Sequence, residues 1–71
     1  MKKIPLYNEE WQLIGEYNVE ELTMLSSGIR EEIKQTIDDV VKVTINLSKG
    51  RIDRERVEYK NGWTKNNFIF S

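Results

Sequence analysis

The sequence predicts a small α+β domain with the order β-β-α-β-β-β, in which one amphipathic helix packs on one face of a mainly antiparallel sheet. Two observations lead to this fold class. Apolar residues at helical spacing run through residues 18–40, and segments typical of strands lie before and after them. The chain has 71 residues, so we expect one domain that spans residues 1–71.

The helix is predicted over residues 18–40. At about 100° per residue its apolar side chains fall within one sector about 120° wide. Asn18 and Glu21 have the spacing of a capping box at the start. Gly28 follows two serines and could end one helix before a second begins, but the apolar stripe crosses it without a change of phase. We therefore expect one helix, bent near Gly28, whose stripe is formed by Leu22, Leu25, Ile29, Ile33, Thr36, Ile37 and Val40.

Before the helix, residues 3–7 and 11–17 are expected to form a hairpin around a polar break. Pro5 lacks a backbone donor, which places the first of these strands at an edge of the sheet. After the helix, residues 41–47 alternate regularly, with Val41, Val43, Ile45 and Leu47 on one face.

Two turns are expected beyond this strand. A three-residue connection at 49–51 would set Val57 opposite Val43 and Tyr59 opposite Val41, whereas a two-residue turn would bring charged residues onto the buried face. Asn61 and Gly62 then form a turn into a last strand, residues 63–70.

The composition argues against catalysis. The chain has no His and no Cys, so the usual general base and the strongest nucleophile are missing. The acidic residues come mostly as adjacent pairs, which diverge on a helix or a strand. The Asp53/Glu55 pair could hold a hard cation, but we interpret it as a solvated partner of the nearby arginines. We expect no enzyme, no cofactor and no metal site.

Size and hydropathy lead to expectations about the localisation and the oligomeric state of the protein. No segment has the length of a membrane span or the apolar core of a signal peptide, so we expect a soluble cytoplasmic protein without membrane contact. The absence of Ala and the abundance of Ile, Asn, Lys and Glu are typical of an AT-rich genome, as in a low-GC bacterium or its phage. A core this small gives only about 3–5 kcal/mol, so self-association is expected, with a dimer as the first hypothesis.

Charge divides the chain into two halves, with net −5 in residues 1–39 (four Lys/Arg, nine Asp/Glu) and +4 in residues 40–71 (seven and three). The basic half suggests a nucleic-acid-binding module, because a two-stranded ribbon or an open sheet with Arg forks suits phosphates and bases. This alternative would use Lys42, Lys49, Arg51, Arg54, Arg56 and Lys60. The acidic sequence pI, about 5.4, argues against a dedicated nucleic-acid binder.

The leading hypothesis is a non-enzymatic binding protein that works through protein contacts, as a regulator or an inhibitor. Aromatic residues in excess of what one small core can hold would mark an interface. The helix face opposite the apolar stripe is acidic and could dock on a basic partner. The expected contact residues are Trp11, Glu20, Met24, Glu31, Asp38, Trp63, Phe68 and Phe70.

Overall fold

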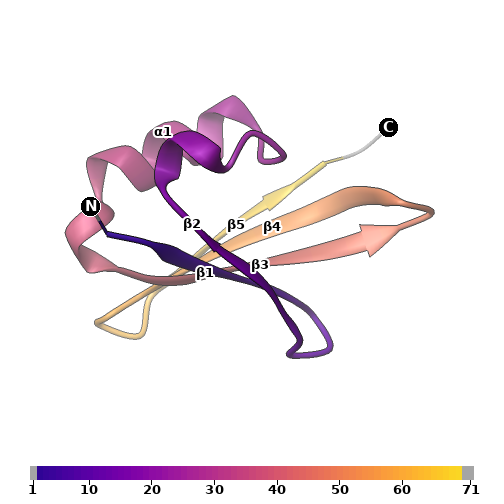
Figure 1. Ribbon diagram of the computed structural model, residues 1–71, viewed down its shortest axis with the longest axis horizontal. Helices are drawn as coiled ribbons and strands as arrows, with labels where there is room; N and C mark the ends of the chain where they lie inside the picture. The colour runs from indigo at the N-terminus through magenta and orange to yellow at the C-terminus, as the bar shows by residue number, and fades with distance from the viewer. Residues whose placement is uncertain (1, 70–71) are drawn as a thin grey trace.

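The computed structural model describes residues 2–69 and shows one α-helix with a five-stranded, mostly antiparallel sheet. The predicted α+β class is confirmed at this level. The helical segments lie together on one side of the twisted sheet (Figure 1). In chain order the elements are β1 (Ile4–Asn8), β2 (Leu13–Tyr17), the 3-10 turn η1 (Val19–Glu21), α1 (Ser27–Gln35), the 3-10 turn η2 (Ile37–Asp39), β3 (Val40–Ser48), β4 (Arg51–Tyr59) and β5 (Thr64–Phe68).

The strands are ordered β2-β1-β3-β4-β5, so β1 is an inner strand. It pairs antiparallel with β2 and parallel with β3. The edge position that Pro5 predicted for β1 is therefore wrong. The parallel ladder starts only at Leu6, opposite Val43, so Pro5 lies before the stretch in which β3 pairs with β1.

The core lies between the sheet and the helical segments. Side chains from β1, β3 and β4 on one sheet face meet those from η1, α1 and the loop between them. We call this the inner face of the sheet and the opposite one the outer face. The buried hydrophobic residues are Ile4, Leu6, Val19, Leu22, Leu25, Ile29, Ile33, Val40, Val43, Ile45 and Val57.

The expectation of one continuous helix over residues 18–40 is wrong. The capping contact at the start does form, since the Asn18 N–H donates to Glu21 Oε1 at 2.8 Å, but this turn ends at Glu21. The α-helix begins only at Ser27, after an extended Ser26, so Gly28 is its second residue. The three residues of η2, Ile37–Asp39, follow beyond its end in 3-10 geometry.

The reason for the break is a carboxylate from the sheet. Glu55 of β4 is 0% exposed and points into the inner face. Its Oε2 accepts the backbone N–H of Ser26 at 2.7 Å, and its Oε1 accepts the Ser26 hydroxyl at 2.7 Å. The amide of Asn67 on β5 donates to the same Oε1 at 2.9 Å. Because the Ser26 N–H is bound to Glu55, it does not bond to a carbonyl in the preceding turn, and α1 starts after it.

The β3–β4 hairpin differs from its predicted turn but keeps the predicted pairing of Val43 with Val57. The turn has two residues, Lys49 and Gly50, both at positive φ (53° and 77°), the geometry of a type I′ turn. This turn is one residue shorter than predicted. The predicted pairing of Val43 with Val57 is kept because β4 has a bulge at Asp53, where the register shifts by one residue.

A second register shift lies at the start of β3. Tyr59 pairs with Val40 and not with Val41, so Val40 is buried and Val41 is exposed. The predicted alternation was therefore displaced at this end, and Leu47 at the other end is exposed too. The turn into β5 also has one residue more than predicted, because the Tyr59 N–H bonds to the carbonyl of Trp63 around an αL Gly62 (φ 86°).

Candidate protein-contact surfaces

Trp11 lies in the loop between β1 and β2, which is organised by Asn8. The Asn8 Oδ1 accepts the backbone N–H groups of Glu10 at 2.9 Å and of Gln12 at 3.0 Å, as in an Asx turn. The Trp11 N–H bonds to the Asn8 carbonyl at 3.2 Å. Within this loop Trp11 has φ 65°, a left-handed conformation that glycine usually occupies.

The Trp11 side chain is 68% exposed and lies against a cation of β3. Lys42 Nζ is 4.6 Å from the centroid of the Trp11 ring and 5.2 Å from that of Tyr7. The same Nζ is 3.5 Å from Glu58 Oε2 on β4. We call Tyr7, Trp11, Lys42 and Glu58 the Trp11 cluster; it brings together three strands and one loop.

A second cluster lies toward the other end of the outer face. Arg54 on β4 forms an ion pair with Glu9 of the β1–β2 loop. Its guanidinium carbon is 5.9 Å from the centroid of the Phe68 ring on β5. The aromatic contact residue Phe68 is thus exposed but held beside a cation whose charge is already compensated.

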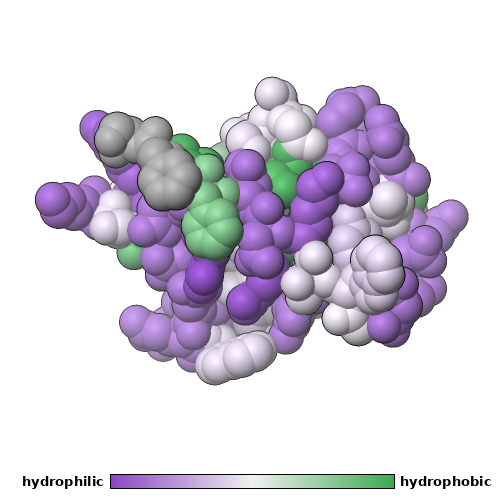
Figure 2. Space-filling view, turned by 180° about the vertical axis from the view of Figure 1, so that it is seen from behind, coloured by the Kyte–Doolittle hydropathy of each residue, from purple (hydrophilic) through white to green (hydrophobic). Residues whose placement is uncertain are grey.

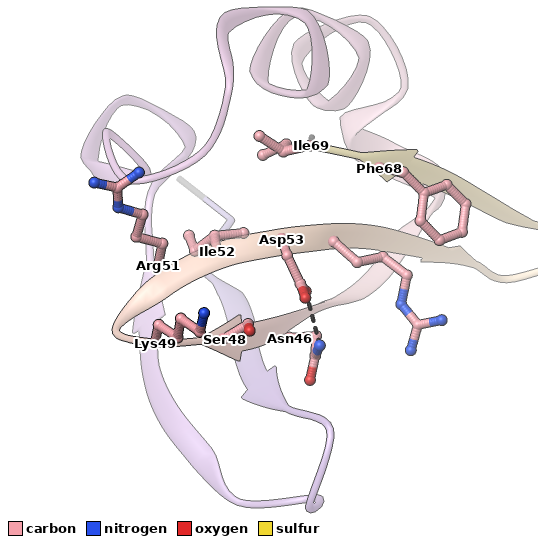
Figure 3. A pocket seen from close by; sticks show the side chains of 9 residues that line it. Asn46, Ser48, Lys49, Arg51, Ile52, Asp53, Phe68 and Ile69 are labelled. Carbon is pink, nitrogen blue, oxygen red and sulfur yellow. Dashed lines mark hydrogen bonds between the residues drawn. The ribbon is translucent and has the colours of Figure 1, made fainter. Parts of the chain in front are cut away.

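An open hollow of about 860 Å³ lies beside this cluster, between the tip of the β3–β4 hairpin and the end of β5 (Figure 3). Lys49 and Arg51 line the hollow from the tip of the hairpin. Next to the bulge on β4, Asn46 Nδ2 donates to Asp53 Oδ1 at 2.7 Å. Phe68 and Ile69 form the wall on the β5 side.

Trp63 lines a smaller hollow, of about 350 Å³, at the opposite end of the sheet. It is 73% exposed, the largest value among the exposed hydrophobic side chains. The helix end and the β4–β5 turn form the other walls, where the Lys60 N–H donates to the Asp39 carbonyl at 2.9 Å. The two tryptophans therefore lie on separate surfaces.

The acidic contact residues do not share one helix face. Glu20 lies in η1, Glu31 in α1 and Asp38 in η2, because the helix is interrupted. All three are exposed, and Glu31 is 3.9 Å from Lys34. Met24 is exposed in the loop before α1. Phe70 lies outside the described residues.

The residues of the nucleic-acid alternative are also dispersed. Lys42, Arg54 and Arg56 lie on the outer face, Lys49 and Arg51 at the hairpin tip, and Lys60 at the other end of β4. Glu58 and Glu9 pair with Lys42 and Arg54, as described above. The Asp53/Glu55 pair is separated as well, because Asp53 bonds to Asn46 whereas Glu55 is buried. The interpretation of Glu55 as a solvated partner of arginine is therefore wrong.

Sequence reasoning missed Tyr7, Glu9 and Glu58 as parts of these clusters. The contact between Tyr7 and Lys42 depends on the parallel pairing of β1 with β3, which no local sequence pattern predicts. The side of the molecule opposite to that in Figure 1 is mostly hydrophilic, with small separate hydrophobic areas (Figure 2).

Comparisons of the chain with models of protein families, with curated proteins and with solved structures found no match. Within residues 2–69, no helix has the length and apolar character needed to cross a membrane.

Proposed function

We propose that this chain is a small non-enzymatic binding protein that acts through protein–protein contacts, as a regulator or an inhibitor, and that also associates with itself. Support comes from the exposure of both tryptophans, at 68% and 73%. Tryptophan is among the residues most enriched at the energetic centres of protein interfaces. Seven further large hydrophobic side chains are exposed within the described residues, and apolar side chains that gather on a surface mark interaction sites.

The conformation of Trp11 carries the proposal. A non-glycine residue in the left-handed region costs about 1–2 kcal/mol. The contact of its exposed ring with Lys42 stabilises the fold by only about 0.5–1 kcal/mol. Folding stability therefore does not explain a tryptophan at this position, whereas binding does, since functional residues often occupy strained backbone positions. The Trp11 cluster is the proposed contact surface.

Protein contact is better supported than nucleic-acid contact. Two of the three outer-face cations, Lys42 and Arg54, lie beside carboxylates within the chain. A phosphate would have to compete with Glu58 and Glu9 for them, which weakens the counterion-release term that drives nucleic-acid binding. An aromatic ring with a compensated cation beside it suits the polar rim and apolar centre of a protein interface.

The test replaces Trp11 by glycine. Partners are captured from a lysate of the source cells, identified by mass spectrometry, purified and titrated by calorimetry. We expect Trp11→Gly to raise the dissociation constant at least about tenfold, as for an interface anchor. Thermal unfolding should show an unchanged or slightly raised stability, because the strain is relieved.

Lys49→Gly is the matched control, because Lys49 also has positive φ but carries no aromatic ring. It should bring a similar gain in stability and leave partner affinity within about twofold. Equal affinity of wild type and Trp11→Gly for every partner identified would contradict the proposed surface.

A further inference from the structure

The two edge strands of the sheet, β2 and β5, differ in regularity. The pairing of β1 with β2 shifts register next to Ile14, and such bulges hinder a further strand from adding to an edge. In contrast, β5 pairs with β4 without any shift, from Thr64 opposite Glu58 to Phe68 opposite Arg54. The β5 edge is therefore the one better suited to pair with a further strand.

The hydrogen bonds at both ends of β5 show which of its residues face outward. The carbonyl of Trp63 accepts the N–H of Tyr59 at 2.9 Å, and the N–H of Ile69 donates to the carbonyl of Asp53 at 2.8 Å. In an antiparallel ladder the residues that bond to one neighbour alternate with those that face away. Residues 63, 65, 67 and 69 therefore bond to β4, and Thr64 and Asn66 direct their N–H and C=O groups outward. Within residues 2–69 no strand pairs with that edge.

We propose that β5 pairs antiparallel with β5 of a second copy of this chain, about a two-fold axis at Asn66, to form a continuous ten-stranded sheet. The inference rests on the self-association included in the proposed function. At the axis, Asn66 of each copy exchanges both backbone hydrogen bonds with Asn66 of the other, because its polar groups already face outward. Two-fold symmetric dimers are the commonest homo-oligomers.

The register matches side chains as well as backbone. Trp63, 73% exposed, comes to lie opposite Ile69 of the second copy, 37% exposed, once at each end of the contact. These are non-hydrogen-bonded positions, where side chains approach most closely. On the outer face Phe68 lies opposite Thr64 of the second copy. Three of the exposed hydrophobic residues at this edge thus gain cross-strand neighbours.

The charges are compatible with this register. Lys65, 3.7 Å from Glu32 of its own chain, lies opposite an uncharged residue, Asn67 of the second copy. In the outer rows Arg54 of one copy shares a row with Glu58 of the other. The two Arg56 side chains share the central row, three strand spacings or about 14 Å apart, which exceeds the Debye length of about 8 Å at physiological salt.

The first experiment measures mass by light scattering and sedimentation over a range of concentrations. The wild type should be a dimer in equilibrium with monomer. Asn66→Pro removes an N–H that faces the free edge and not β4, and edge strands tolerate proline. We expect it to raise the dimer dissociation constant at least about tenfold while circular dichroism keeps the folded spectrum.

The second experiment uses the absence of cysteine from the chain. In Asn66→Cys the two thiols face each other across the axis, with Cα atoms about 5.5 Å apart, within the range of a disulfide. Mild oxidation should convert this variant into a covalent dimer. Thr64→Cys is the matched control on the same edge, because residue 64 lies about 13 Å from its own copy. Glu16→Cys on β2 tests the other edge.

A wild type that stays monomeric up to millimolar concentration would overturn this inference. A dimer that cross-links through Glu16→Cys or Thr64→Cys and not through Asn66→Cys would overturn it too. A monomer that still binds a partner through Trp11 would leave the proposed contact surface standing, so the two failures can be told apart.

Discussion

Thr44 is a buried polar residue in the middle of the outer face. It is 3% exposed, and its hydroxyl has no hydrogen-bond partner within the described chain. Tyr7 and Arg56 are its neighbours on the adjacent strands. A buried hydroxyl without a partner costs about 1–3 kcal/mol in lost hydration.

We therefore predict that Thr44→Val, which keeps the shape of the side chain, raises the free energy of unfolding by about 1 kcal/mol. Urea denaturation with an unchanged m-value would measure it. Thr36→Val is the control at a satisfied hydroxyl, which donates to the Glu32 carbonyl at 2.7 Å. This variant should lose about 1 kcal/mol. A loss at position 44 as large as that at position 36 would contradict the prediction.

At the scale of elements, the start of α1 depends on a residue of β4. Three donors, from Ser26 and Asn67, converge on the buried Glu55 carboxylate. We predict that Glu55→Gln lowers the free energy of unfolding by about 2–3 kcal/mol, because an amide meets these donors with only one accepting oxygen.

Urea denaturation would measure this loss, and hydrogen exchange of the Ser26 amide should become faster. Glu31→Gln serves as control, because this exposed carboxylate makes only a surface ion pair, worth about 0–1 kcal/mol. Equal stability of the two variants would show that Glu55 does not determine where the helix begins.

Glu55 lies far from the helix in the sequence, and this distance explains which elements could be predicted and which could not. The strands and the apolar residues of the helical region follow from local periodicity. The helix interruption does not, since it depends on Glu55, 29 positions after Ser26 in the chain. The bulges at Val41 and Asp53 escaped prediction for a related reason, because each adjusts one strand to its neighbour. Of the candidate surfaces, exposed aromatic residues could be anticipated but not their cationic partners.

At the scale of the whole molecule, the two oppositely charged halves of the sequence meet within the fold. The ion pairs of Glu9 with Arg54 and of Glu32 with Lys65 both join the acidic first half to the basic second half. Part of the charge asymmetry of the sequence is thus compensated by ion pairs within the monomer.

We predict that labelled DNA and RNA show no steep salt-dependent binding by fluorescence anisotropy. A doubly substituted Arg54→Ala, Arg56→Ala chain should behave like the wild type. Affinity that falls sharply with salt in the wild type, with a smaller slope in the double variant, would instead favour the nucleic-acid function.

The position of β1 between β2 and β3 has a consequence for biosynthesis. This strand emerges from the ribosome first, but its parallel neighbour follows 37 residues later, as the pairing of Leu6 with Val43 shows. Until then only β2 can pair with it, and its apolar side chains have no complete core to enter. The meander β3–β4–β5 has short connections and can form as soon as it is made. We therefore expect the amino-terminal hairpin to complete its sheet pairing only after β3 has been synthesised and can pair beside β1.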